Sequence, residues 1–113
     1  MHEYSIVEAL LARVNAEARA QGATAVHRLT VRIGELSGVE IDLLAAAFAT
    51  FRDRTICAHA DLDVMRVPAI WRCPVCGGQI ERGSMLQCAP CGAPARLAQG
   101  DEILLDRIEM EVP

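Results

Sequence analysis

The sequence has no lysine, few aromatic residues and no long apolar run. All eleven cationic side chains are arginines, and fifteen acidic residues give the 113-residue chain a formal charge of −4. A net negative chain lacks the dense cationic face that nucleic-acid binding requires, so the composition disfavours that class. No apolar run approaches the roughly 20 residues that span a bilayer, so we expect no membrane segment. The N-terminus has no basic stretch before an apolar block, so we expect no secretory signal and a cytoplasmic location.

Five cysteines and a hydrophobic fraction of 52% are what the sequence does have. That hydrophobic fraction is enough to build a real core. Four of the cysteines form two pairs, and in a reducing compartment such pairs act as metal ligands and not as disulfides. The fifth, Cys57, has no base beside it, and we expect it to be a buried, inert thiol.

The N-terminal third of the chain has the periodicity of a helix followed by a strand. Apolar residues recur at helical spacing between residues 5 and 20, with Ser5 and Glu8 at the spacing of a capping box. Residues 27–33 alternate apolar with polar, which predicts a strand with one buried face. The expected buried face comprises His27, Leu29, Val31 and Ile33.

A second helix is predicted for residues 40–52, after a glycine-rich turn. Ser37 and Glu40 have the spacing of a second capping box. Strand periodicity returns at residues 61–67 and again at residues 102–112, where adjacent leucines at 104 and 105 indicate a bulge. The predicted core face of the second helix comprises Ile41, Leu44, Ala45, Phe48 and Phe51.

The order of these elements predicts an α+β fold. The last strand has no partner nearby, so we expect it to return to the first sheet and pair there. The chain is then a small α/β domain, two helices on a three-stranded mixed sheet, made by residues 1–69 and 99–113. A four-cysteine zinc ribbon, residues 70–98, is inserted into it.

The ribbon prediction depends on two knuckles separated by eleven residues, Cys73 with Cys76 and Cys88 with Cys91. Two residues between thiolates let one tight turn direct both sulfurs at one ion. The glycine after each knuckle permits the positive backbone angle that lets amides approach the sulfurs. Four thiolates select zinc or iron, and a closed shell leaves no open position for a substrate. Because the segment has too little apolar periodicity for its own core, we predict a structural zinc that folds it.

The first three residues form a second candidate metal site. A histidine after the initiator methionine is too bulky for methionine removal, so the α-amine of Met1 stays free. That amine, the amide nitrogens of His2 and Glu3 and the His2 imidazole can close adjacent chelate rings around one ion. Four nitrogens in a plane suit Ni(II) or Cu(II) and not zinc. Binding requires a neutral amine and imidazole, so affinity should fall on acidification.

Three motifs together extend this reading over essentially the whole chain. They are Met1-His2-Glu3-Tyr4-Ser5, Ile33-Gly34-Glu35-Leu36-Ser37-Gly38-Val39, and the two knuckles followed by Gly100-Asp101-Glu102. In content and order they resemble the hydrogenase maturation nickel metallochaperones, the HypA/HybF family.

The resemblance implies a non-enzymatic protein that delivers nickel to the large subunit of NiFe hydrogenase, and in some members serves urease. It implies work with a GTPase of the same maturation pathway. Glu40 matches a position that is acidic in some relatives and approaches the nickel. The state of association stays open between a monomer and a weak or strand-swapped homodimer. The implied ligands are Met1, His2 and Glu3 for nickel, His2 being essential, and Cys73, Cys76, Cys88 and Cys91 for zinc.

Two other functions use similar knuckles. A zinc-ribbon nucleic-acid-binding or regulatory protein needs a basic stripe, whereas residues 70–98 hold three arginines and one tryptophan. A rubredoxin-like iron electron carrier needs an aromatic shell that four aromatic residues do not supply. His27 and His59 have no partner at ligand spacing, so we expect ordinary surface residues or residues satisfied by their neighbours. No Ser-His-Asp order or phosphate-binding loop is present, and we expect no enzyme.

Overall fold

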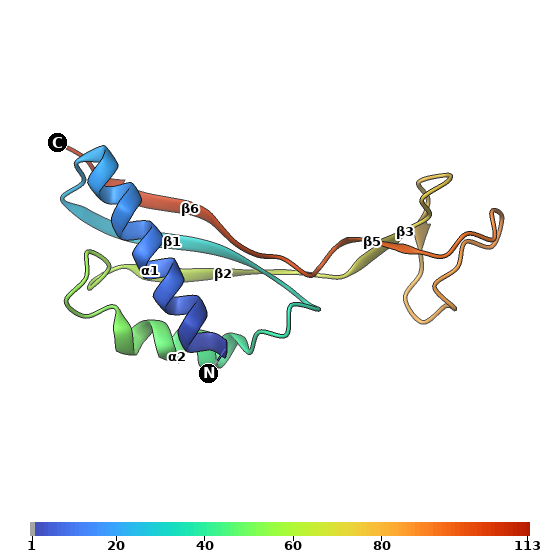
Figure 1. Cartoon of the computed structure of the whole chain (residues 1–113), viewed down its shortest axis with the longest axis horizontal. Helices are drawn as coiled ribbons and strands as arrows, with labels where there is room; N and C mark the ends of the chain where they lie inside the picture. The colour runs from blue at the N-terminus through green and yellow to red at the C-terminus, as the bar shows by residue number, and fades with distance from the viewer. Residues whose placement is uncertain (1) are drawn as a thin grey trace.

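A computed structural model describes residues 2–113 and shows two lobes joined by a narrow waist (Figure 1). The radius of gyration is 18.0 Å, whereas a compact chain of this length has about 13 Å. The chain is therefore elongated, with extents of 56 × 29 × 16 Å. The α/β lobe contains α1 (His2–Gln21), β1 (Ala25–Gly34), α2 (Ile41–Phe51), β2 (Asp61–Val67) and β6 (Ile103–Glu111); the ribbon lobe contains β3 (Ile70–Arg72), β4 (Gln79–Ile80) and β5 (Arg96–Gln99).

The α/β lobe is the predicted pair of helices on a three-stranded mixed sheet. Its strand order is β2-β1-β6, with β1 parallel to β2 and antiparallel to β6. The helices pack on each other and cover one face of the sheet (Figure 1). On the open face, Arg28 makes ion pairs with Asp63 at 2.8 Å and Glu109 at 3.7 Å. The fully buried core includes Val7, Val14, Ala18, Val26, Leu29, Val31, Ile33, Leu44, Ala47 and Phe48.

Helix α2 forms within one residue of its predicted range of 40–52, but neither helix has the cap that its local sequence predicts. Helix α1 begins at His2, so Ser5 lies inside the helix and is not its cap. Helix α2 begins at Ile41 after Glu40, which makes no side-chain cap, and the Ser37 hydroxyl accepts the Val39 N–H at 3.3 Å. Both predicted capping boxes are therefore wrong, and at the start of α2 a contact with α1 takes the place of the box, as described below.

The strand predictions are confirmed with two local departures. Residues 61–67 form β2 as predicted, and β6 pairs with β1 as expected. The register between β1 and β6 shifts at His27 and at Asp106, so each of these residues is the extra one in a bulge. The bulge at Asp106 directly follows the two leucines that indicated it. The bulge at His27 turns that side chain to solvent, so its predicted burial is wrong.

Helix α2 is narrower on its buried face than its sequence suggests. Leu44, Ala47 and Phe48 are buried, and the burial of Leu44 and Phe48 was predicted. Ala45 is exposed, and Phe51 is 42% exposed with its ring edge-on to Tyr4, the centroids 5.2 Å apart. Phe51 is the last residue of the helix and stays partly open to solvent, so its predicted burial is wrong.

The ribbon lobe is a three-stranded antiparallel sheet of order β4-β3-β5. It leaves the α/β lobe after β2 and returns to it before β6, as an insertion does. Its core contains three buried residues, Cys73, Ile80 and Cys88, with Trp71 packed against them. Two of these three are cysteines, so hydrophobic burial alone gives this lobe little stability.

Candidate metal centres

The four paired cysteines meet at one end of the ribbon lobe. Their Sγ atoms all lie within 4.8 Å of one another. This is the one group of three or more His, Cys, Asp or Glu side chains at metal-binding spacing among residues 2–113. One cysteine of each knuckle is buried and the other is exposed.

The two knuckles are built alike. In each, the glycine that follows the second cysteine donates its N–H to the carbonyl of the first cysteine. Gly77 donates to Cys73 at 2.9 Å, and Gly92 donates to Cys88 at 2.7 Å. Gly77 and Gly92 have φ of 74° and 69°, the left-handed region that glycine adopts without strain. The sequence predicted this role for both glycines.

The thiols themselves show why this cluster suits a cation. The N–H groups of Cys76 and Val75 face the Cys73 sulfur and lower its pKa to about 7. The neighbouring thiols of Cys76 and Cys88, together with burial, raise the pKa of Cys91 to about 12. Four thiolates at this spacing repel one another, and a tetrahedral divalent ion removes that repulsion. The donor set therefore fits zinc, with all four positions filled by protein.

The N-terminal candidate site lies in the other lobe, at the start of α1 beside α2 (Figure 1). Met1, one of its predicted ligands, is outside the described residues. The His2 side chain is exposed, whereas Glu3 is 7% exposed and is the one buried charged residue of the described chain. The first N–H groups of a helix have no acceptor within it, so the amides of His2 and Glu3 are outside the helical ladder.

Glu3 joins the first turn of α1 to the first turn of α2. Its Oε2 accepts the Glu40 N–H at 3.2 Å. This hydrogen bond, then that from its own N–H, lowers the pKa of the Glu3 carboxyl against the opposing effect of burial. A capping box would supply such an acceptor from within the helix, and here a different helix supplies it. From the sequence, only the backbone amide of Glu3 was assigned a role, and the role of its side chain was missed.

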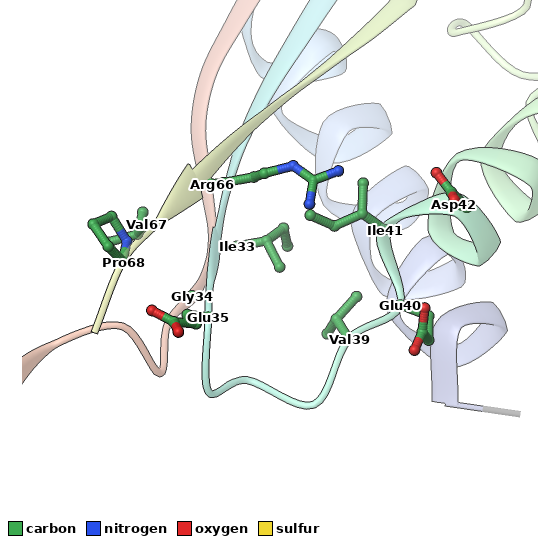
Figure 2. A pocket seen from close by; sticks show the side chains of 10 residues that line it. All are labelled: Ile33, Gly34, Glu35, Val39, Glu40, Ile41, Asp42, Arg66, Val67 and Pro68. Atoms are coloured by element: carbon green, nitrogen blue, oxygen red, sulfur yellow. The ribbon is translucent and has the colours of Figure 1, made fainter. Parts of the chain in front are cut away.

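Glu40 is placed beside this junction. Figure 2 shows its carboxylate next to the start of α1, on the wall of a cleft of about 420 Å³ between the 34–42 segment and the end of β2. Asp42 and Arg66 line the same cleft. Glu40, which the family resemblance singled out, therefore lies at the same end of the lobe as His2 and Glu3.

The residues set aside from the sequence lie away from both centres. His27 contacts Glu111 at 3.2 Å on the surface, and His59 is exposed. Cys57 is fully buried, and burial raises the pKa of its thiol. Its predicted inertness agrees with that environment, because the thiolate is the reactive form.

Comparison with known proteins identifies the family. Residues 1–110 match the family model described as HypA, hydrogenase/urease nickel incorporation, metallochaperone. The chain belongs to the HypA family. The hydrogenase maturation factor HypA of Wolinella succinogenes is 40% identical over 117 residues, covering 98% of this chain and 96% of the relative. That of Shewanella halifaxensis is 37% identical over 113 residues, covering 98% of each chain.

Solved structures of HypA proteins have the same fold. The solution structure of the Ni metallochaperone HypA from Helicobacter pylori matches with a TM-score of 0.73 at 30% identity, covering 98% of each chain. A second solution structure, described as that of HypA protein, matches with a TM-score of 0.81 at 31% identity, covering all of this chain and 98% of the other. The similarity includes both lobes, ribbon and α/β.

Family membership decides between the functions that the knuckles left open. The chain is a nickel metallochaperone for hydrogenase and urease maturation, a binding and transfer protein and not an enzyme. The nucleic-acid-binding and iron electron-carrier hypotheses are set aside on this ground. Neither helix within residues 2–113 is long and apolar enough to cross a membrane.

Proposed function

We propose that the chain carries Ni(II) at its N-terminus, on the Met1 amine, the amide nitrogens of His2 and Glu3, and the His2 imidazole. The observation that carries this proposal is the placement of His2 and Glu3 in the first turn of α1. There the imidazole is exposed, and the backbone N–H groups lie outside the helical hydrogen-bond ladder. A planar set of four nitrogens favours Ni(II).

The Glu3 side chain supports the site without occupying a ligand position in it. Its hydrogen bond to the Glu40 N–H ties the start of α1 to the start of α2. The same contact holds the Glu40 backbone at the nickel-binding end of the lobe, so the Glu40 carboxylate would lie near a bound ion. Glu40 is thus an additional, weaker ligand in this proposal.

The four-cysteine cluster holds zinc in this proposal, with Cys73, Cys76, Cys88 and Cys91 as the ligands. A zinc ion bound there stabilises residues 70–98 and takes no part in transfer, since no coordination position is open. The two lobes then form separate domains, residues 1–69 with 99–113 and residues 70–98. Each has its own core cluster.

Membership of the HypA family supports a route for the nickel in this proposal. The chain works in the cytoplasm with a GTPase of the maturation pathway and delivers Ni(II) to the large subunit of NiFe hydrogenase. Thiols left free for metal binding fit a reducing compartment.

The test is a Ni(II) titration of the untagged, zinc-loaded protein, the His2→Ala variant and a form with one extra N-terminal residue. We expect both altered forms to lose the high-affinity site, since one lacks the imidazole and the other moves the amine out of register. Affinity of the native protein should fall on acidification as the amine and imidazole take up protons.

His27→Ala is the matched control, because His27 is also an exposed histidine of the α/β lobe but lies on β1. It should bind Ni(II) like the native protein. Equal affinity in all four forms would refute the N-terminal site. Zinc should remain at one ion per chain throughout, since no form alters a cysteine.

A further inference from the structure

Three stretches of backbone meet at the waist between the lobes. They are the turn after β1, the β2–β3 connection and the β5–β6 connection. The Gly34 N–H donates to the Glu102 carbonyl at 2.7 Å, and the Leu36 N–H donates to the Gly100 carbonyl at 2.6 Å. The Glu35 N–H donates to the Val67 carbonyl at 2.8 Å. The turn is thereby bonded to both connections that lead to the ribbon.

Two glycines permit this close packing. A Cβ on Gly34 would lie 2.2 Å from the carbonyl carbon and oxygen of Gly100. A Cβ on Gly100, whose φ is 114°, would lie 2.5 Å from the Ala69 Cα. Both contacts are with backbone or Cα atoms that cannot turn aside. Two of the motifs that pointed to the family, at residues 33–39 and 100–102, therefore form the waist.

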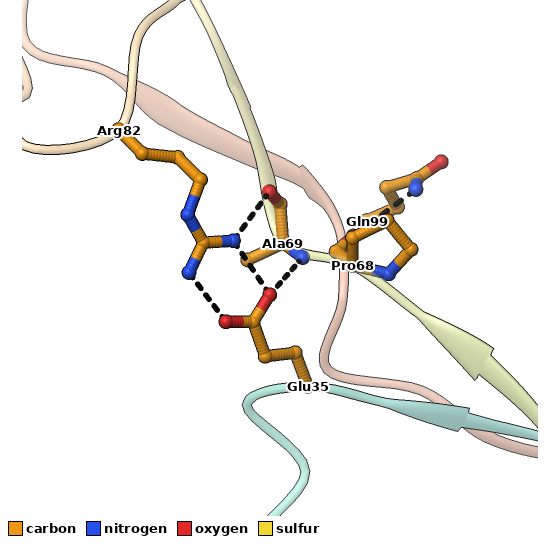
Figure 3. Close-up of polar contacts among 5 residues, drawn as sticks. All are labelled: Glu35, Pro68, Ala69, Arg82 and Gln99. Atoms are coloured by element: carbon orange, nitrogen blue, oxygen red, sulfur yellow. Dashed lines mark hydrogen bonds and ion pairs between the residues drawn. The ribbon is translucent and has the colours of Figure 1, made fainter.

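The Glu35 side chain is at the centre of this waist and reaches both lobes (Figure 3). Its Oε1 accepts the Ala69 N–H at 2.8 Å. Both carboxylate oxygens also accept hydrogen bonds from the Arg82 guanidinium, Oε1 at 2.6 Å from Nη1 and Oε2 from Nη2. A two-point contact between guanidinium and carboxylate fixes direction as well as distance.

Arg82 belongs to the ribbon. It follows β4 in the loop between the two cysteine knuckles, so its backbone moves with that lobe. Its Nη1 lies 3.5 Å from the Ala69 carbonyl oxygen as well. The Arg82–Glu35 pair is the one ion pair that joins the two lobes in the described part of the chain.

We propose that Arg82 and Glu35 form a clasp that fixes the orientation of the ribbon relative to the α/β lobe and positions the 35–40 segment. The segment is held at both ends, at Glu35 by the clasp and at Glu40 by Glu3. Opening the clasp frees the ribbon to rotate about the waist and loosens the segment that presents Glu40. Arg82 is a positioning residue in this scheme and binds no metal.

The first consequence, a fixed ribbon, is independent of nickel. The second, a tighter nickel site, rests on the proposed N-terminal site. The pair is exposed, with 61% of the Arg82 side chain and 38% of the Glu35 side chain accessible. We therefore expect the open form to become about two- to fivefold more populated without the pair, the range that an exposed ion pair supports.

The experiment measures residual dipolar couplings on the full-length, zinc-loaded protein and on Arg82→Ala and Glu35→Gln. Glutamine keeps an oxygen for the Ala69 N–H but loses the charge that Arg82 needs. Glu35→Gln therefore removes the clasp and keeps the hydrogen bond to the β2–β3 connection. Both lobes of the native protein should fit one alignment tensor. In each variant the two lobes should need two different tensors. The couplings of the ribbon should be smaller, because its motion averages them.

Arg96→Ala is the matched control, because it removes an exposed arginine of the same lobe that has no partner in the clasp. It should keep the single tensor. A single shared tensor in both Arg82→Ala and Glu35→Gln would overturn the clasp.

Competition with a colorimetric chelator then reports Ni(II) affinity. Arg82→Ala should bind Ni(II) up to about fivefold more weakly with unchanged zinc content, whereas Arg96→Ala should match the native protein. If His2→Ala leaves affinity unchanged while Arg82→Ala still separates the tensors, the nickel site fails and the clasp stands. If Arg82→Ala binds Ni(II) as tightly as the native protein while His2→Ala loses the site, the claim that Arg82 positions the 35–40 segment is overturned.

Discussion

The two lobes of this HypA-family chain reach a folded state by different physical means. The α/β lobe buries a continuous apolar cluster contributed by both helices and all three strands. The ribbon lobe buries three residues, of which two are cysteines. One lobe is stabilised by removal of apolar surface from water, and the other needs bonds to a metal.

Under the proposed function, this contrast lets one short chain hold two metals for opposite purposes. A closed shell of four thiolates binds firmly and shields its ion, which suits a structural role. An exposed chelate at the chain end can be reached by a partner and can release its ion. The binding of the cargo is thus separated from the metal that supports the fold.

The largest expected effect breaks the ribbon alone. Cys73→Ser removes one thiolate, and structural zinc contributes on the order of 10 kcal/mol in comparable small modules. Residues 70–98 should unfold, while the α/β lobe keeps its native amide spectrum. Two-dimensional amide NMR with zinc analysis measures both. Cys57→Ser is the control, since Cys57 lies in the other core, and a native-like ribbon in zinc-free Cys73→Ser would contradict this account.

The converse change damages the α/β lobe. Leu44 on α2 is 1% exposed, and its replacement by alanine should lower the free energy of unfolding by about 3–5 kcal/mol through lost burial and a cavity. Urea unfolding followed by helical circular dichroism measures it. The neighbouring Leu43 is 48% exposed, so Leu43→Ala should cost far less. Equal losses in the two variants would show that the core is not packed as described.

The third change tests the waist that joins the lobes. Gly34→Ala places a methyl group against the Gly100 backbone, and we expect a loss of about 1–3 kcal/mol from this overpacking. Altered amide shifts should concentrate at residues 34–36, 67–69 and 99–102. Gly38→Ala is a useful comparison: nothing lies within 4 Å of its Cβ position, but its φ of 79° adds strain without a clash. Shifts confined to residue 34 itself would argue against the three-way contact.

The smallest effect concerns the charge of the clasp. The hydrogen bonds from Arg82, then that from Ala69, lower the pKa of the Glu35 carboxyl to about 2. Because the folded-state pKa is depressed, the contribution of this pair is complete above the usual carboxylate range and is lost as the pH falls toward 2. In a pH titration followed by carbon NMR, the Glu35 carboxyl of Arg82→Ala should titrate at a higher pH than that of the native protein. An unchanged midpoint would mean that Arg82 does not hold the carboxylate.

Much of the fold followed from local patterns. The helical stripe of α1, the strand at residues 61–67 and the knuckle glycines were all predicted, because each depends on the spacing of neighbouring residues. The return of β6 to the first sheet was predicted too, since an unpaired strand must find a partner. Prediction failed at the two helix caps and at the burial of His27 and Phe51. In those places a distant contact or a bulge overrides the local pattern.

The sequence by itself determined which ligands we predict, because two cysteine knuckles and a Met-His-Glu start are chemical patterns that need no fold to be recognised. Tertiary structure alone decided how those ligands are held. Glu3 caps a helix 37 residues away, and Glu35 pairs with an arginine 47 residues away. Such contacts join side chains whose separation along the chain carries no periodic signal, so they exist only after the sheet has brought their backbones together.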